Sequence, residues 1–340
     1  MFNMRSLKIV SSILILLLLT FIAIKYSQNN IHILEGKIFG TYYRIKIRSF
    51  GLHKNLHSEI LSGFDTINNS MSVFVSDSEV SKINQSDANE KIKISADLYK
   101  VLLASQEVYK QSNGWFDPTI GKIIEIWGFG TNREQNIPKE DIIKEELKYS
   151  GFNKLELSQG YVLKKNKHTN LNLSAIAKGY AVDKTAEIIE KFGYDNYVID
   201  IGGEIKVKGS RTNKTSGWNI GVALPKEDAL GNTITIELSD YAIATSGDYR
   251  NFYYKDGKKY SHTISPFSGY PVEHYLVSVS IFHPQCMIAD AFATAMMSMG
   301  ENKAIEFANK NKLAAILIIK HADNNFEYIF SDAAQNLTGE

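Results

Sequence analysis

The stretch IADAFATAMM, residues 288–297, places one carboxylate and one hydroxyl four residues apart in an otherwise apolar segment of small side chains. Pro284 before it and Gly300 after it are typical helix boundaries, so the stretch predicts an α-helix. Residues four apart lie on one helical face, so the oxygens of Asp290 and Thr294 point the same way. Such hard oxygen ligands suit Mg²⁺ on a phosphate substrate. The structural alternative is a paired aspartate and a threonine bonded to its own helical turn.

Composition limits the class of protein. The chain has 340 residues, enough for one large domain or two, and its 44% hydrophobic content predicts a packed core. The formal charge is +1, and the lysines are scattered among acidic residues. Because nucleic-acid-binding proteins usually carry a basic patch or stripe, this balance argues against a nucleic-acid partner.

The amino terminus differs from the rest of the chain. Arg5 and Lys8 precede an apolar run over residues 9–24, which Lys25 closes. As a helix this run spans roughly 24 Å at about 1.5 Å per residue, slightly less than the hydrocarbon core of a bilayer. We interpret it as an uncleaved inner-membrane anchor, with the positive end in the cytoplasm and the following chain on the periplasmic side. A cleaved secretory signal peptide is the alternative, although residues 22–26 offer no clean small-x-small cleavage site.

The chain is accordingly divided into an anchor with a polar linker, residues 1–30, and a catalytic domain, residues 31–340. Strand-like and helical runs do not alternate as in a doubly wound parallel fold, so an α+β class is expected. Neither a G-x-G-x-x-G nor a G-x-x-x-x-G-K-[ST] motif occurs. The expected strands are 41–47, 197–201, 218–224, 233–238, 275–282, 314–319 and 326–330, and the expected helices are 52–69, 96–112, 139–149, 175–192, 287–299 and 303–311.

Residues 170–180 lead into one of these helices. Ser174 is a plausible N-cap. Lys178 then falls in the first turn, where its charge opposes the helix dipole, so an anionic partner is expected. The lysine and the free backbone N–H groups would form a phosphate site. The alternative is a solvated lysine on a tightly packed helix.

Other loops carry weaker signals. Asp117 lies in a turn that could meet a polar ring edge or merely pack against aromatic side chains. The glycine pair 202–203 and the segment 245–249 each follow a strand, which favours close approach of a ligand or a β-bulge. His262 adjoins a turn and is a titratable group suited to catalysis. The only cysteine, Cys286, excludes an intrachain disulfide.

Taken in chain order, these segments resemble the ApbE family, the FAD:protein FMN transferases that attach flavin to membrane redox subunits. The resemblance extends from about residue 39 to residue 300, and its specificity lies in the common order of the motifs. The motifs are FGT (39–41), MSVF (71–74), SEVS (78–81) with Asn84, FDPT (116–119), AKGYAVD (177–183), IGG (201–203), TSGDY (245–249) and ADA (289–291) with Thr294.

The resemblance implies a mixed-sheet α+β fold related to the T-fold, FAD as substrate and a divalent metal, usually Mg²⁺. Asp290, Thr294 and the backbone carbonyl of Ala175 would hold the metal, and His262 would assist catalysis together with the metal-binding pair. The implied FAD-binding residues are Phe39, Ser72, Val73, Phe74, Asp117, Lys178, Thr245, Ser246, Gly247 and His262.

The implied reaction joins FMN, through a phosphoester, to a threonine of a membrane redox subunit of the Nqr or Rnf type and releases AMP. Phosphoryl transfer needs mainly positioning and charge neutralisation, which a metal and Lys178 would supply. Either His262 or a metal-polarised oxygen would accept the hydroxyl proton. The family's acceptor pattern, Asp-x-x-[Ser/Thr]-[Gly/Ser]-Ala-Thr, is absent from this chain, so the acceptor is expected to be a separate protein.

Three departures from the family pattern stand out. Asn172 and Ser265 replace residues that are usually Asp, and the lipid-modified amino-terminal cysteine of many exported members is missing. Two other functions use the same features: a metal-dependent FAD pyrophosphatase that releases FMN and AMP, and a membrane-tethered flavin-binding protein without turnover. An anchored α+β domain of unknown role is the remaining alternative.

Overall fold

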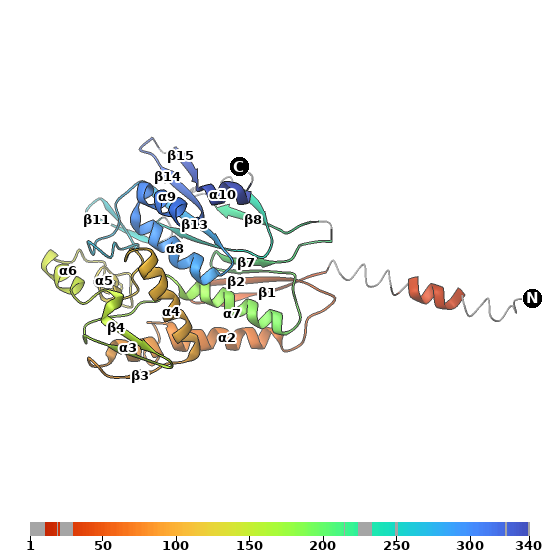
Figure 1. Ribbon diagram of the computed structural model, residues 1–340, viewed down its shortest axis with the longest axis horizontal. Helices are drawn as coiled ribbons and strands as arrows, with labels where there is room; N and C mark the ends of the chain where they lie inside the picture. The colour runs from red at the N-terminus through yellow and green to blue at the C-terminus, as the bar shows by residue number, and fades with distance from the viewer. Residues whose placement is uncertain are drawn as a thin grey trace, which may run out of the picture.

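An eight-stranded sheet with strand order β1-β2-β6-β7-β10-β13-β14-β15 organises the computed structural model (Figure 1). The structure describes residues 11–18, 20, 30–213, 215–223, 233–248, 251–323 and 325–338. Every pairing in this sheet is antiparallel, so the expected mixed sheet is wrong, although the α+β class is confirmed. Neighbours such as β1–β2 and β6–β7 are hairpins joined by short turns, which force antiparallel pairing. The strands are β1 (Ile31–Ile38), β2 (Thr41–Arg48), β6 (Tyr197–Ile201), β7 (Glu204–Lys208), β10 (Ala242–Gly247), β13 (Leu276–His283), β14 (Ala314–Lys320) and β15 (Phe326–Phe330).

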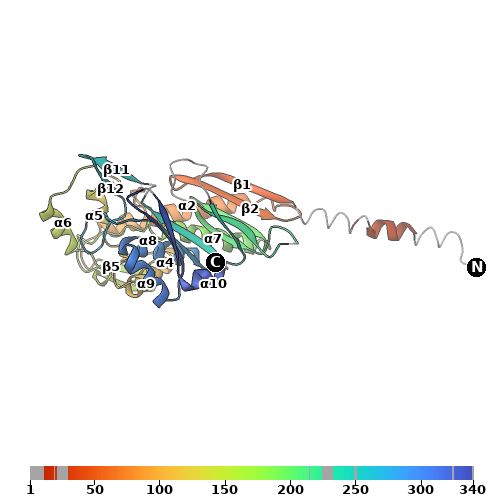
Figure 2. The same ribbon diagram turned by 90° about the horizontal axis from the view of Figure 1, so that it is seen from above.

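The two faces of the sheet are covered differently. Along β6, Ile199 packs into the main core beneath the helices, whereas Val198 packs into a second core on the opposite face. This alternation follows from the two-residue period of a strand. The hairpin β8–β9 and α10 cover the second core. The main core is covered by helices that lie together on one side of the sheet (Figures 1 and 2). These elements are α2 (Leu56–Met71), α4 (Ala96–Gln111), α7 (Ala177–Lys191), α8 (Cys286–Met299), α9 (Glu301–Lys310), β8 (Trp218–Ala223), β9 (Thr233–Leu238) and α10 (Asp332–Thr338).

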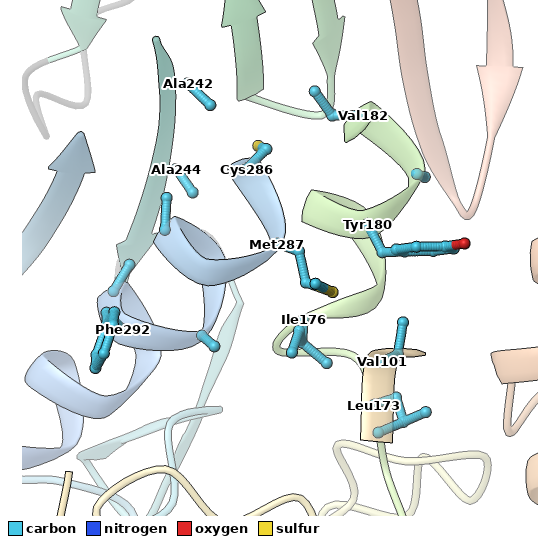
Figure 3. Packing of buried hydrophobic residues seen from close by; sticks show 14 of the residues in the cluster. Val101, Leu173, Ile176, Tyr180, Val182, Ala242, Ala244, Cys286, Met287 and Phe292 are labelled. Atoms are coloured by element: carbon cyan, nitrogen blue, oxygen red, sulfur yellow. The ribbon is translucent and has the colours of Figure 1, made fainter. Parts of the chain in front are cut away.

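Helices α7 and α8 cross at very short distance in the centre of the main core. A Cβ on Gly179 would lie 2.5 Å from the carbonyl oxygen of Cys286, so only glycine fits at this crossing. Figure 3 shows Ile176 and Leu173, just before α7, directed into the core beside Met287 and Val101. The contact fixes the start of α7 against the first turns of α8.

Two smaller groups of elements complete the described part of the chain. One surrounds Trp127, whose ring contacts Tyr260 and whose Nε1 donates to the Gly269 carbonyl at 2.7 Å. It contains α5 (Gly121–Ile126), α6 (Glu140–Leu147), β11 (Phe252–Lys255) and β12 (Lys258–Ser261). The other contains α3 (Glu79–Gln85), β3 (Ile92–Lys93), η1 (Phe152–Lys154), β4 (Leu155–Ser158) and β5 (Tyr161–Lys164).

Most expected elements occur within a few residues of their expected bounds, but three points differ. Helix α7 begins at Ala177 with Ile176 as N-cap, so Ser174 is not the capping residue. Strands β1, β7 and β10 of the large sheet, and the short strands β3, β4, β5, β11 and β12, have no counterpart among the expected strands. Of the apolar run 9–24, residues 11–18 are helical, residue 20 is also described, and the others lie outside the described residues. Within the part of the chain that the structure describes, no helix is both long and apolar enough to cross a membrane.

Candidate active site

A cavity of about 370 Å³ opens between α8, β10, the start of α7 and the loop after β12. A second hollow of about 520 Å³ adjoins it, and the two share Phe74, Ser174 and Lys178 in their walls. Every residue expected at the site lines one of these two spaces. The cavity is lined by Phe74, Asp117, Ala175, Lys178, Thr245, Ser246, Gly247, His262, Asp290 and Thr294, and the second hollow by Phe39, Ser72, Val73, Phe74 and Lys178.

The i, i+4 pair on α8 faces the cavity as its spacing predicts. Asp290 is only 5% exposed, and its Oδ2 accepts a hydrogen bond from the Gly179 amide at 3.0 Å. Burial raises the pKa of this carboxyl group, while the charge of Lys178 and the Gly179 amide act in the opposite direction. The Thr294 hydroxyl lies 3.2 Å from that of Ser246 on β10. The pair is thus held from two sides, by α7 and by the sheet.

Lys178 has the anionic partner that its place in the first turn of α7 predicts. Its Nζ forms a salt bridge with Glu204 at the start of β7. The Glu204 side chain is 1% exposed, whereas that of Lys178 is 34% exposed and reaches both spaces. The sheet therefore supplies the anion that holds the lysine at the junction.

The donor set around Asp290 fits a magnesium ion. The Gly179 amide, which in a regular helix would donate to the carbonyl four residues earlier, donates to Asp290 instead. The Ala175 carbonyl is thereby left out of the helical ladder next to the carboxylate, and Ala175 lines the same cavity. A carboxylate, a hydroxyl and a carbonyl are hard oxygen ligands. Among the described residues, no group of three or more His, Cys, Asp or Glu side chains is placed to hold a metal ion.

Asp117 lies in a tight turn at another wall of the cavity. Its Oδ1 accepts hydrogen bonds from the backbone amide and the hydroxyl of Thr119, at 2.8 and 2.6 Å. Burial raises the pKa of Asp117 despite these bonds. A carboxyl group held in this way can recognise an N–H group on the edge of a ring.

His262 follows β12 and lines the same cavity. Its Nδ1 lies 2.9 Å from the backbone carbonyl of Asn251. Because a carbonyl oxygen can only accept, Nδ1 must carry the hydrogen in this contact. In the neutral ring Nε2 is then the nitrogen able to take up a proton, an arrangement suited to general-base catalysis.

Several lining residues escaped the sequence-based prediction. Glu204 could have been found from its place after the glycine pair 202–203, whereas Asn251, Trp115 and Phe129 carry no comparable signal. Arg133 lines the second hollow from the loop between α5 and α6. Asn172, noted only as a departure from a family pattern, lines the cavity, and its Oδ1 accepts from the Ser174 amide at 2.9 Å.

Comparison with known proteins gives a consistent result. Residues 39–317 match the model of the ApbE family. The chain is 34% identical over 344 aligned residues to the FAD:protein FMN transferase of Haemophilus influenzae, covering 97% of this chain and 98% of that one. It is 35% identical to the FAD:protein FMN transferase of Vibrio cholerae, with 88% and 90% covered.

Solved structures agree. The flavin transferase ApbE from Vibrio cholerae superposes with a TM-score of 0.83 at 32% identity, covering 91% of this chain and 99% of that one. The apo form of the flavinyl transferase ApbE from Pseudomonas stutzeri superposes with a TM-score of 0.84 at 29% identity, covering 92% of this chain and 98% of that one.

Proposed function

Because the chain belongs to the ApbE family, we propose that it is an FAD:protein FMN transferase that moves FMN from FAD to a threonine hydroxyl of another protein. The observation that carries this proposal is the junction of the two spaces at Lys178, beside the Asp290–Thr294 pair. FAD has two ring systems joined by a pyrophosphate. One ring system would occupy the cavity and the other the second hollow. The pyrophosphate would then lie beside Lys178, between the two.

The proposed reaction is a single displacement at phosphorus. The oxygen of the acceptor threonine attacks the FMN-side phosphorus and forms a phosphoester bond, while the bond from that phosphorus to the bridging oxygen breaks. AMP leaves with the electron pair of that bond. The threonine proton passes to a base, so the products are acceptor-bound FMN, AMP and one proton. In such a reaction the protein mainly aligns the reacting groups and stabilises the charge on the phosphates.

Residues of this chain have distinct roles in that reaction. Asp290, Thr294 and the carbonyl of Ala175 would hold Mg²⁺, which supplies positive charge at the pyrophosphate. Lys178, oriented by Glu204, binds a phosphate oxygen. Nε2 of His262 accepts the threonine proton, with its tautomer fixed by Asn251.

The charge balance of the cavity supports the metal requirement. Among the residues that the structure describes, its lining includes three carboxylates, Asp117, Glu204 and Asp290, against one lysine, Lys178. A pyrophosphate dianion entering this cavity meets negative potential, because Lys178 is already paired with Glu204. A divalent cation bound at Asp290 reverses that potential.

The sequence supports two further proposals, one on the acceptor and one on the location. We propose that the acceptor is a membrane redox subunit of the Nqr or Rnf type carrying the Thr-containing pattern, and that residues 9–24 hold the enzyme at the inner membrane. The catalytic domain, residues 31–340, then works on the periplasmic side.

The test is to incubate the full-length protein in detergent with FAD, Mg²⁺ and a protein carrying the acceptor pattern, and to measure the acceptor's intact mass. Transfer gives an FMN-sized increase that maps to the pattern's threonine and disappears when that threonine is replaced by valine. Free FMN and AMP with an unmodified acceptor would mean a pyrophosphatase instead. Unchanged FAD would mean a flavin-binding protein without turnover.

A further inference from the structure

The segment that precedes α7 alternates between core and cavity. Leu171 and Leu173 are buried in the main core, while Asn172, Ser174 and Ala175 between and after them line the cavity. In such a segment a shift of one residue would exchange the two sets of side chains. Whatever fixes its register therefore decides which groups face the substrate.

Two contacts from outside the cavity fix this register. The side-chain amide of Asn84, at the end of α3, binds both backbone groups of Leu171: its Nδ2 donates to the carbonyl at 2.9 Å, and its Oδ1 accepts from the N–H at 2.7 Å. A side-chain amide that satisfies both groups of one residue substitutes for a neighbouring strand. It holds Leu171 in place without touching the cavity itself.

Asn84 is held in turn by a buried lysine. Lys164, the last residue of β5, is completely buried, and its Nζ donates to the carbonyls of Asn84 and Lys167 at 2.8 and 2.9 Å. Both partners are neutral carbonyls, and burial lowers the pKa of the ammonium group, while the charges of Asp87 and Glu90 act in the opposite direction. A buried lysine with this environment is costly to the fold, which points to a use beyond packing.

The opposite side of the segment is tied to the turn that carries Asp117. The Asn172 amide donates to the Pro118 carbonyl at 2.8 Å, and the Gly121 amide donates to the Asn170 carbonyl at 2.9 Å. We call the two hydrogen bonds between Asn84 and Leu171 the Asn84 clamp. The segment thus lies between the Asp117 turn and this clamp. Loss of the clamp would free one side only, leaving the core contacts of Leu173 in place.

We propose that Lys164 and Asn84 are positioning residues for the FAD site: Lys164 orients Asn84, and Asn84 sets the register that presents Asn172, Ser174 and the Ala175 carbonyl to the substrate. The proposal rests on the proposed function, because FAD is taken as the ligand. Neither residue lines the cavity or the second hollow. Their effect passes through the backbone of Leu171.

The test compares Asn84→Ala, Lys164→Met and the double variant with Ser331→Ala as a matched control. Ser331 is also fully buried and its hydroxyl also bridges backbone groups, donating to the Leu313 carbonyl at 2.7 Å and accepting from the Ala315 and Ala334 amides at 2.9 and 3.2 Å. It lines neither space. FAD affinity is measured by flavin fluorescence and compared with the melting temperature of each variant.

We expect Asn84→Ala and Lys164→Met to weaken FAD binding and kcat/KM by about ten- to hundredfold, because small displacements of a site are strongly felt. Ser331→Ala should lower the melting temperature and leave FAD affinity unchanged. Since the two residues act in series, the double variant should bind FAD no worse than Asn84→Ala.

Wild-type FAD affinity in folded Asn84→Ala would overturn the proposal, as would equal loss in Ser331→Ala. If Lys164→Met does not fold, Asn84→Ala decides alone. The proposed function is judged separately, by FMN transfer in the unmodified protein, so a failure there is distinguishable from a failure of the clamp.

Discussion

At the scale of single residues, the Asp290 carboxylate is the group on which the proposed chemistry depends most. It is buried, it accepts one hydrogen bond from the Gly179 amide, and it faces the cavity next to Thr294. A carboxylate in such surroundings is stabilised by a cation. Its removal should therefore affect metal use far more than it affects folding.

We expect Asp290→Ala to lower transfer by roughly 10²-fold or more while costing no more than about 1–2 kcal/mol of unfolding free energy, since only the Gly179 amide loses its acceptor. Asp290→Asn should recover some activity at high Mg²⁺ concentration. Thr294→Val should raise the Mg²⁺ requirement with little effect on stability. Transfer rates across a Mg²⁺ titration, with melting curves, check this. Normal metal-dependent transfer in Asp290→Ala would contradict the assignment.

Asp117 gives a prediction for stability against pH. Burial raises its pKa in the folded protein, so the folded state holds this proton more tightly than the unfolded chain does. The stability that protonation provides is complete below the unfolded pKa and is lost as pH rises through the raised folded pKa. From about pH 4 upward, the wild type should therefore lose stability relative to Asp117→Asn. Denaturant titrations of both proteins at several pH values measure the difference. A difference that stays constant or moves in the opposite direction would be evidence against the raised pKa.

The sequence predicts those site residues whose geometry depends only on nearby positions in the chain. Asp290 and Thr294 share a helical face by spacing alone, and Lys178 needs an anion because of its place in a helix. The glycine pair before Glu204 marks it as a candidate lining residue, but its pairing with Lys178 is not encoded locally, since the contact depends on where β7 lies beside α7. The clamp of Asn84 on Leu171 joins residues 87 positions apart, and no spacing in the chain encodes it.

At the scale of elements, the crossing of α7 and α8 joins the helix that carries Lys178 to the helix that carries Asp290 and Thr294. Asp183 on α7 accepts hydrogen bonds from the Cys286 and Met287 amides, at 3.1 and 2.9 Å, and so caps α8 from the neighbouring helix. Gly179 makes the close approach possible. Backbone geometry at this crossing therefore sets the position of Lys178 relative to Asp290.

Gly179→Ala should be strongly destabilising, because the added Cβ would lie 2.5 Å from the Cys286 carbonyl oxygen. Relieving the clash must separate the helices and break the Gly179–Asp290 hydrogen bond. We expect a loss of about 1–3 kcal/mol of unfolding free energy, with a weaker Mg²⁺ response in the protein that remains folded. Gly51→Ala is the control, since a Cβ there meets nothing within 4 Å. Equal stability of the two variants would argue against a tight crossing.

Among elements, the long helices and most sheet strands were predictable because burial imposes a clear period on their sequences. The short strands β11 and β12 were not, since four residues are too few to establish alternation. The direction of strand pairing could not be predicted from the sequence either. The sheet was expected to be mixed, and only the structure shows that all its strand pairs are antiparallel.

At the scale of the whole molecule, the apolar run 9–24 makes a prediction about location. Arg5 and Lys8 precede it, which favours a cytoplasmic amino terminus. A reporter that is active only outside the cytoplasm, fused after Glu340, should therefore be active. The same fusion with residues 1–30 removed serves as the control and should be inactive. Activity of a cytoplasm-specific reporter at the same position would contradict the proposed topology.

The chain should not modify itself. No stretch of it fits the acceptor pattern, so full-length protein incubated with FAD and Mg²⁺ alone should keep its unmodified mass. The same incubation with an acceptor present is the positive control. A flavin-sized adduct on one of the enzyme's own threonines would refute a strictly separate acceptor.

One measurement tests the central claim most directly: the amounts of AMP, free FMN and acceptor-bound FMN formed in a single reaction with FAD and Mg²⁺. We expect one AMP for each FMN bound to the acceptor and no free FMN, because the bond that forms and the bond that breaks share one phosphorus. AMP matched by free FMN, with no flavin on the acceptor, would contradict a transferase.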